Sequence, residues 1–400
     1  MGVLPQTVYP VFFLFLFFAA PLKHSGPEAV LWTAPAILLA SLMIAWAAEA
    51  SQYFVAQGFA LAILAWMQTL PEFAVEAVLA WHQQTHLLLA NLTGALRLLT
   101  GLGWPAIYFT AAFFHRRIHR APLRRIRLEN HHAVEVVGIL AALLYIPVIA
   151  WKGSLTVWDG VVLILIYAAY LIILGKLPPE DHEEIDDLER IPRAIVLSPR
   201  VGRILAITAL FTAGGALIYF SAEPFLASLL ALATVAGVPE FVFIQWLAPL
   251  VSEFPEMAST LYWARRPDRA SMALMNMVSS NINQWTLLTA MLPVIYSLSY
   301  GAVTPIIFDG KQKGELWLTL GQAGVAVIFL LNMELAWWEA TVLAVLFAVP
   351  FFNAAAAMIV AWIYFAWIGI ECVRMLIGQR RAEALPLFAA VWRAHVRRAA

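Results

Sequence analysis

The sequence predicts an all-α polytopic membrane protein that contains two related halves of opposite orientation. Hydrophobic residues make up 62% of the 400 residues and charged residues only 12%, whereas soluble domains are about 45–50% apolar and 25% charged. Two similar stretches, Leu70–Glu72 and Phe254–Glu256, both end in Pro-Glu and lie inside apolar segments. Basic residues cluster in short loops, which orients the segments between them.

The apolar runs of the chain predict twelve membrane spans. A helix of about 20 apolar residues crosses a hydrocarbon core about 30 Å thick. The first run has no basic segment before it, so we interpret it as a membrane helix and not as a cleavable signal peptide. The apolar stretch 222–237 either extends the span before it or lies at the interface, and this point stays open. The predicted spans lie near 8–22, 30–50, 55–80, 87–113, 132–151, 157–175, 203–221, 238–262, 270–299, 316–332, 335–352 and 355–377.

Arginine-rich loops predict which ends of the spans face the cytoplasm. The densest basic cluster runs from His115 to Arg127, and the positive-inside rule makes it cytoplasmic. Counting spans from there also places the loop with Arg265 and Arg269 and the tail from Arg380 to Arg398 inside. Both termini are therefore expected in the cytoplasm, and the compact loops favour a bacterial inner membrane. The net charge of zero argues against a nucleic-acid partner.

On this count the two Pro-Glu stretches lie on helices that run in opposite directions. Asn91 follows Glu72 by 19 positions and Asn276 follows Glu256 by 20, so a whole unit is duplicated. Such a pattern is typical of inverted repeats with a binding site near the membrane midplane. The predicted parts are an extra N-terminal helix (1–28), a first repeat (29–175), an acidic cytoplasmic linker (176–202), a second repeat (203–352) and an extra C-terminal helix with a basic tail (353–400).

The duplicated unit predicts a cation site. A carboxylate inside a span costs about 2.5–3.5 kcal/mol on insertion scales, so a repeated one indicates a function. Each proline breaks its helix and frees a carbonyl oxygen beside the glutamate. Oxygen-bearing side chains surround both glutamates at helical spacing, and such ligands suit Ca²⁺, Na⁺ or protons but not a soft metal. They are Gln68, Glu72 and Glu76 in the first copy and Ser252, Glu253, Glu256, Asn276, Ser280 and Gln284 in the second copy.

These residues resemble the signature of the sodium/calcium exchanger superfamily of cation antiporters, and the chain is identified as a divergent member. The signature is close to G-T-S-L-P-E, followed on the next helix by G-N-x-x-G-S-N-I-x-N. Residues 67–72 and 90–99 match it in part, and residues 251–256 and 275–284 match it better. The resemblance covers residues 30–352 and implies two inverted five-helix repeats. It also implies ion ligation by Thr69, Glu72, Ser252, Glu256, Ser280 and Gln284, with Asn91 and Asn276 at the asparagine positions of the signature.

The first copy departs from this signature, which keeps two functions open. Ala95 and Leu99 stand where the family supplies oxygen ligands, and Arg97 adds a cation that is able to pair with Glu72 or Glu76. The first function is a secondary antiporter that moves Ca²⁺ or a related cation against Na⁺ or H⁺ by alternating access. The second is a non-transporting membrane protein that retains the exchanger scaffold, with Arg97 as an internal cation.

Other features favour neither an enzyme nor a resident cofactor. The chain has no Walker loop, so an ion gradient is the expected driving force, with Glu72 and Glu256 binding the transported cation as cargo. His131, His132 and Glu135 suggest a metal enzyme only weakly, and an interfacial structural role fits this helix start better. The expected partners are the lipid bilayer and inorganic cations. Glu334 and Glu339 are expected in solvent or at the interface, and the linker is expected to be solvated.

Overall fold

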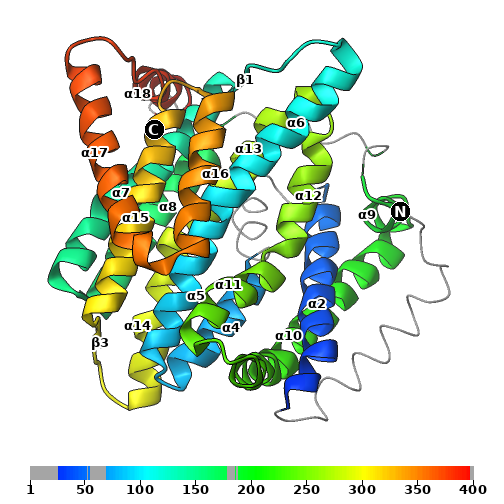
Figure 1. Ribbon diagram of the computed structural model, residues 1–400. Helices are drawn as coiled ribbons and strands as arrows, with labels where there is room; N and C mark the ends of the chain where they lie inside the picture. The colour runs from blue at the N-terminus through cyan, green and yellow to red at the C-terminus, as the bar shows by residue number, and fades with distance from the viewer. Residues whose placement is uncertain (1–25, 52, 55–68, 178–184, 186–187, 397–400) are drawn as a thin grey trace. The chain divides into compact units, whose positions relative to one another are not determined.

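The computed structural model describes residues 26–51, 53–54, 69–177, 185 and 188–396, and these are almost entirely helical (Figure 1). The predicted helix near 8–22 lies outside the described residues, as does Gln68. Six of the described helices are long and apolar enough to cross a membrane, so a polytopic helical protein is confirmed while the count of twelve spans stays a prediction. The chain forms two compact units, one from Met1–Leu79 with Pro179–Pro255 and one from Ala80–Pro178 with Glu256–Ala400.

Two long helices form the centre of the first unit. They are α2 (Val30–Ser51) and α10 (Arg200–Ala236), which pack side by side (Figure 1). The stretch 222–237 extends the predicted span before it into α10, which settles its placement. The close approach of α2 and α10 depends on Gly214, because a Cβ atom there would lie 2.9 Å from Cγ1 of Ile44. Small residues at such contacts let membrane helices pack tightly.

The end of the linker packs on the first unit. A short helix, α9 (Arg190–Val196), follows the linker, whose acidic residues between 180 and 187 lie outside the described part of the chain. The indole nitrogen of Trp46 on α2 donates a hydrogen bond to Oε2 of Glu189 over 2.8 Å. This end of the linker is therefore held against α2 and is not simply solvated. Its apolar side chains share a buried cluster made of Ala50, Leu188, Ile195 and Val196.

Each Pro-Glu stretch begins a short helix. α4 (Leu70–Trp81) starts after a turn at Thr69, and α12 (Phe254–Ala264) starts just after α11 (Glu240–Ser252) ends. Each proline therefore lies in the first turn of its helix, where its missing N–H leaves no hydrogen bond unmade. The predicted break is confirmed at Glu253 in the second copy. In the first copy the residues before Thr69 lie outside the described ranges.

The second unit contains two helical hairpins that match each other. The first helix of each hairpin has a short strand on either side, and the strands pair crosswise. β1 pairs antiparallel with β4 and β2 with β3, so α7 and α15 run in opposite directions. The strands were not predicted, but they are only two or three residues long and leave the fold helical. The elements are β1 (Arg125–Arg127), α7 (Ala133–Lys152), β2 (Ser154–Leu155), α8 (Val157–Leu174), β3 (Ile306–Ile307), α15 (Gly310–Leu330), β4 (Glu334–Ala336) and α16 (Trp337–Phe352).

Two further helix pairs of the second unit contain π-helical segments at matched places. Each pair forms one continuous helical run, as predicted for 87–113 and 270–299, with the π segment in its middle. The first π segment is Leu99–Gly103 and the second is Gln284–Leu288. Such segments hold an inserted residue and often mark functional sites. The helices are α5 (Thr85–Leu98), α6 (Trp104–His119), α13 (Ala270–Asn283) and α14 (Thr289–Tyr300).

The C-terminal part adds α17 (Ala357–Leu376), which packs on α15, and a short helix, α18 (Ala384–Val391), which was not predicted. The tail also corrects the expectation for Glu339, which is only 1% exposed. Arg380 inserts beside it and donates to Oε1 of Glu339 and to Oε2 of Glu371, over 3.1 Å each. A buried carboxylate requires such a partner, and no local sequence pattern predicts one 41 positions further along the chain.

Candidate functional site

Glu256 is the predicted ligand whose surroundings the structure describes best. It lies in the first turn of α12 and is 9% exposed. Its Oε2 accepts a hydrogen bond from the hydroxyl of Ser280 on α13 over 2.9 Å. Its Oε1 is buried and has no hydrogen-bond partner among the residues that the structure describes. A buried acceptor left without a donor costs about 1–3 kcal/mol, so this oxygen is suited to a bound cation or proton.

Three more predicted ligands, Asn276, Ser280 and Gln284, follow at intervals of four residues along α13 and into the second π segment. Asn276 is half-buried, whereas Ser280 and Gln284 are buried. Gln284 is the first residue of the second π segment. Asn281, which was not predicted to be a ligand, helps to position α13. Its Oδ1 accepts a hydrogen bond from the indole nitrogen of Trp104 over 3.1 Å. This bond ties α13 to the start of α6.

The predicted ligands near the two helix starts are also buried. Thr69, Glu72 and Glu76 are each at most 2% exposed and lie in the first unit. Asn91 is 2% exposed and lies on α5 of the second unit. Because Glu72 and Glu256 belong to different units, the convergence of their carboxylates stays a prediction. Buried carboxylates at both helix starts are nevertheless what a cation site requires.

The break between α11 and α12 places two more predicted ligands. The hydroxyl of Ser252 donates to the carbonyl oxygen of Ala248 in its own helix over 3.2 Å. Glu253 is fully buried at the break, and its backbone N–H donates to the carbonyl oxygen of Pro249 over 2.8 Å. The broken turn therefore brings a buried carboxylate to the position directly before the helix of Glu256.

Arg97 has a counter-ion within the second unit. Its Nη1 lies 2.5 Å from Oε2 of Glu315, and its carbonyl oxygen accepts a hydrogen bond from Gln322 over 2.9 Å. Both partners lie on α15. Hydropathy starts this span at residue 316 and so missed Glu315. Asp309 and Gln312 bond each other's backbone N–H in a capping box, and this signal places the helix start at Gly310.

The histidine pair has a structural environment. Nδ1 of His132 lies 3.1 Å from the hydroxyl of Ser271 and accepts from the backbone N–H of Glu129 over 3.3 Å. The ring of His131 packs 4.2 Å from that of His132. Within the described ranges no group of three or more histidine, cysteine, aspartate or glutamate side chains is arranged to hold a metal. These contacts favour the predicted structural role at the helix start.

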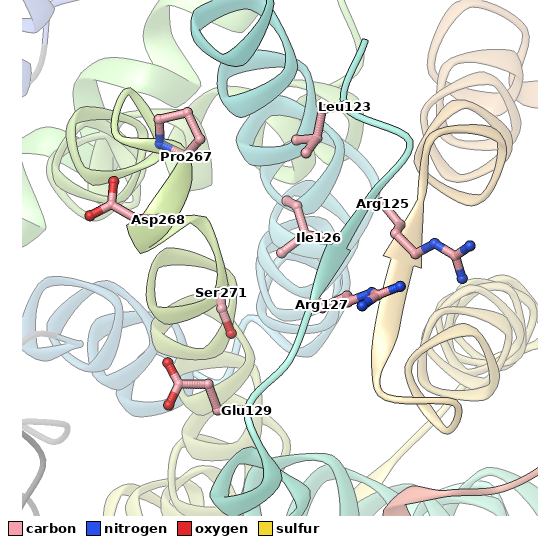
Figure 2. A pocket seen from close by; sticks show the side chains of 8 residues that line it. All are labelled: Leu123, Arg125, Ile126, Arg127, Glu129, Pro267, Asp268 and Ser271. Atoms are coloured by element: carbon pink, nitrogen blue, oxygen red, sulfur yellow. The ribbon is translucent and has the colours of Figure 1, made fainter. Parts of the chain in front are cut away.

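A pocket of about 290 Å³ lies beside the helix start that holds His131 and His132, and is lined in part by Glu129 and Ser271. All three residues of β1 line this pocket, and Figure 2 shows that strand alternation points the side chain of Ile126 toward Ser271 and those of Arg125 and Arg127 in the opposite direction, toward β4. There Arg125 donates to Glu334 over 2.8 Å, and this hydrogen bond raises the pKa of Arg125. None of the predicted ion ligands is among the pocket's lining residues, which are Leu123, Arg125, Ile126, Arg127, Glu129, Pro267, Asp268 and Ser271.

Removing the hydroxyl of Ser280 is expected to weaken cation binding. Ser280→Ala deletes the hydrogen bond to Glu256 and one oxygen ligand, which predicts an increase of about tenfold in the cation concentration at half-maximal transport, since a hydrogen bond to a charged group contributes about 1.5–3 kcal/mol. Transport into proteoliposomes measures this concentration. Ser279→Ala is the matched control, because the hydroxyl of Ser279 meets Tyr170 at 3.1 Å. Equal values for the two variants would refute the role of Ser280.

Comparison with solved structures finds similar folds along nearly the whole chain. The crystal structure of the H⁺/Ca²⁺ exchanger CAX has a TM-score of 0.86 and 31% sequence identity, covering 97% of this chain and 98% of its own. The structure of native YfkE has a TM-score of 0.57 at 16% identity, covering 88% of this chain and 99% of its own. The sodium-calcium exchanger NCX_Mj has a TM-score of 0.51 at 17% identity, covering 86% and 99%. A comparison with curated protein sequences gives no match.

The family model described as "Sodium/calcium exchanger protein" matches residues 29–176 and 206–368, which is most of the chain. Together with the apolar helices, this match makes the chain a multi-pass membrane protein. The resemblance that the Pro-Glu stretches indicated is thereby confirmed. The chain belongs to the sodium/calcium exchanger family.

Proposed function

We propose that the protein is a secondary antiporter that moves Ca²⁺ across its membrane in exchange for H⁺. Family membership supports cation antiport, and the likeness to an H⁺/Ca²⁺ exchanger over nearly the full length of both chains supports this pair of ions. The observation that carries the proposal is the buried carboxylate of Glu256, which has one oxygen bonded to Ser280 and the other without a partner among the described residues.

The proposed site is asymmetric between the two copies. Ca²⁺ takes about 6–8 oxygen ligands, and the second copy offers more of them than the first. Ser280 and Gln284 correspond to Ala95 and Leu99, which are buried and apolar. The proposed ligands are Thr69, Glu72, Glu76, Gln68 and Asn91 from the first copy and Ser252, Glu253, Glu256, Asn276, Ser280 and Gln284 from the second.

We place these ligands in two inverted repeats of five helices, with one extra helix at each end. The crosswise pairing of β1 with β4 and of β2 with β3 supports inversion, because it makes α7 and α15 antiparallel. The π segments support the same alignment, since Leu99 and Gln284 are separated by the same 185 positions as Asn91 and Asn276. Inverted repeats of this kind alternate access around a central site.

The charge of the carboxylates explains why exchange is coupled. Empty and ionised, Glu72 and Glu256 carry negative charge that resists movement past an apolar gate. A bound cation or protons neutralise this charge and allow the protein to switch between its inward and outward openings. The site therefore changes from one opening to the other only when it holds a cation or protons, which is the property of an exchanger.

Ca²⁺ flux into proteoliposomes under separate gradients tests the proposed ion pair. A pH gradient is expected to drive ⁴⁵Ca²⁺ uptake, and nigericin is expected to abolish it by collapsing that gradient. Protein-free liposomes and the Glu256→Gln variant serve as controls for leak. Uptake driven by a Na⁺ gradient at equal pH on both sides would replace H⁺ by Na⁺ as the counter-ion. Failure of both gradients to move Ca²⁺ would refute the proposal.

The ion pair of Arg97 bears on the alternative of a non-transporting scaffold. Glu315 balances the charge of Arg97 within the second unit, which supports a structural role for this arginine alongside transport. Arg97→Asn separates the two functions. If the protein is an antiporter, the parent is expected to exchange cations in a flux measurement. If it is a non-transporting scaffold, the parent is expected to show no exchange, and Arg97→Asn is expected to gain cation binding in isothermal titration.

Breaking this pair is expected to destabilise the second unit. Arg97→Gln leaves Glu315 without its cation and is expected to cost about 3 kcal/mol, because removing one partner of a buried pair strands the other charge. Thermal unfolding in detergent measures the loss. The double variant Arg97→Gln/Glu315→Gln is expected to recover part of it. Equal stability of the single variant and the parent would show that the pair contributes nothing.

We further propose a bacterial inner-membrane location with both termini in the cytoplasm. The basic clusters between His115 and Arg127 and between Arg265 and Arg269 support this orientation. In this proposal the protein is not an enzyme and needs no resident cofactor, since the cation is cargo. Its partners are lipid and inorganic ions.

A further inference from the structure

The segment after α17 is held at the end of the helices of the second unit. The chain turns at Gly378, whose φ of +75° suits glycine. The guanidinium of Arg380 then donates to the carbonyl oxygens of Ile328 and Phe329 near the end of α15, over 3.1 and 3.3 Å. The first residue of α18, Ala384, donates its N–H to the carbonyl oxygen of Leu331 over 2.9 Å.

These contacts fix the position of α18 relative to the end of α15. α17 is long and apolar enough to cross a membrane, and it ends at Leu376. α18 begins eight residues later, beside the end of α15. Figure 1 shows α18 nearly end-on while α15, α16 and α17 are seen from the side, so α18 lies across the ends of these helices. A helix placed so at the end of a span lies at the level of the lipid headgroups.

The free face of this segment combines apolar and basic side chains. Leu385 and Trp392 are 46% and 40% exposed, and their spacing of seven residues places them on one helical face. Arg381 and Arg393 are exposed beside them. Tryptophan and arginine at this level are typical of the membrane interface. We call these four side chains, Arg381, Leu385, Trp392 and Arg393, the tail surface.

The charge around the tail surface favours an anionic partner. Between residues 381 and 396 the only acidic side chain is Glu383, against Arg381 and Arg393. The same end of the second unit holds β1, which carries the exposed Arg127, while its Arg125 is paired with Glu334 of β4. Each arginine near an anionic membrane surface strengthens association by about fivefold. Apolar side chains alone would not distinguish one headgroup from another, whereas two exposed arginines favour an anionic one.

We propose that the tail surface binds the headgroups of anionic phospholipids in the leaflet at the β1–β4 end of the protein. Leu385 and Trp392 enter the boundary between headgroups and acyl chains, and Arg381 and Arg393 contact lipid phosphates. This interaction is separate from cation exchange, because no predicted ion ligand lies between residues 353 and 400.

Binding of short-chain lipids to the full-length protein in detergent tests the headgroup preference. Native mass spectrometry would count bound dioctanoylphosphatidylglycerol and dioctanoylphosphatidylcholine at equal concentrations. The parent is expected to prefer phosphatidylglycerol, and Arg381→Gln/Arg393→Gln is expected to reduce that preference by up to about 25-fold, since each arginine accounts for about fivefold. Lys311→Gln/Lys313→Gln removes two charges at the start of α15, near β3, and is expected to keep it. An unchanged preference in the arginine variant would overturn the proposal.

A depth measurement tests the apolar part independently of lipid charge. Cys372 is the single cysteine and is exposed, so Cys372→Ser gives a background for site-directed spin labels. In bilayers containing phosphatidylglycerol, a label at Leu385→Cys is expected to be more accessible to oxygen than to a water-soluble nickel chelate. A label at the exposed Glu383→Cys is expected to show the reverse. Equal access of the nickel chelate to both labels would overturn the proposal.

Discussion

Proteoliposomes that contain Glu256→Gln are expected to take up Ca²⁺ at no more than about one hundredth of the parent rate, a loss that corresponds to about 3 kcal/mol. Glutamine keeps the size of the side chain and an oxygen for the hydrogen bond from Ser280, which spans 2.9 Å in the parent. It removes the negative charge at the buried Oε1, where a cation is expected to bind. Because that oxygen is buried, water screens its interaction with a cation only weakly.

The control for this prediction changes the same charge at an exposed place. Glu240 begins α11 and is exposed, so Glu240→Gln is expected to transport at the parent rate. Glu72→Gln is expected to behave like Glu256→Gln, because the proposed site needs both carboxylates. Parent-like transport by both Glu72→Gln and Glu256→Gln would show that the site lies elsewhere.

Arg380→Met is expected to destabilise the protein by about 3–5 kcal/mol, the cost of breaking a buried ion pair from one side. Arg380 is 8% exposed and lies between Glu339 and Glu371, which are almost fully buried. Methionine fills much of the volume but leaves Glu339 without a cation and strips the end of α15 of a hydrogen-bond donor. Thermal unfolding in detergent, followed by size-exclusion chromatography of the heated protein, measures the loss.

Two variants show whether the effect comes from charge. Arg381→Met changes the neighbouring exposed arginine and is expected to stay within about 0.5 kcal/mol of the parent. Adding Glu339→Gln to Arg380→Met removes one stranded charge and is expected to restore part of the stability. If Arg380→Met unfolds at the parent temperature, the tail is not a structural part of the second unit.

The pair of Arg380 and Glu339 has a counterpart in the matching hairpin. Asp159 lies near the start of α8 as Glu339 lies near the start of α16, and each carboxylate accepts the N–H of the residue three positions before it. Asp159 pairs with Lys152 at the end of the preceding helix. The position that corresponds to Lys152 is Asn332, and Arg380 supplies the cation instead. The C-terminal extension thus completes a feature that the first hairpin contains by itself.

Apolar length was enough to predict the position of several long helices. The predicted span 132–151 corresponds to α7 (Ala133–Lys152), and 157–175 corresponds to α8 (Val157–Leu174). The Pro-Glu stretches also predicted the break between α11 and α12, because proline cannot continue the hydrogen-bond ladder. The burial of Glu72 and Glu256 followed from their position inside apolar runs.

Contacts between distant parts of the chain could not be predicted in the same way. Arg97 and Glu315 are 218 positions apart, and no local periodicity relates them. The strands are two or three residues long and exist only through their partners, so their sequences are too short for an alternating pattern to predict a strand. The π segments at Leu99 and Gln284 likewise depend on packing between helices. What hydropathy does not encode is therefore the set of polar contacts that join one helix to another.

The position of the bound ion tests directly whether Glu72 and Glu256 form one cation site. Crystals of the protein soaked in Sr²⁺, a heavier substitute for Ca²⁺, would give an anomalous difference peak at the bound cation. We expect one peak within about 2.7 Å of a carboxylate oxygen of Glu256 and of Glu72, close to the 2.3–2.6 Å of Ca²⁺ sites. That peak is expected to be absent from crystals of Glu256→Gln. A peak that lies away from both carboxylates, or that persists unchanged in the variant, would show that these two residues do not form the cation site.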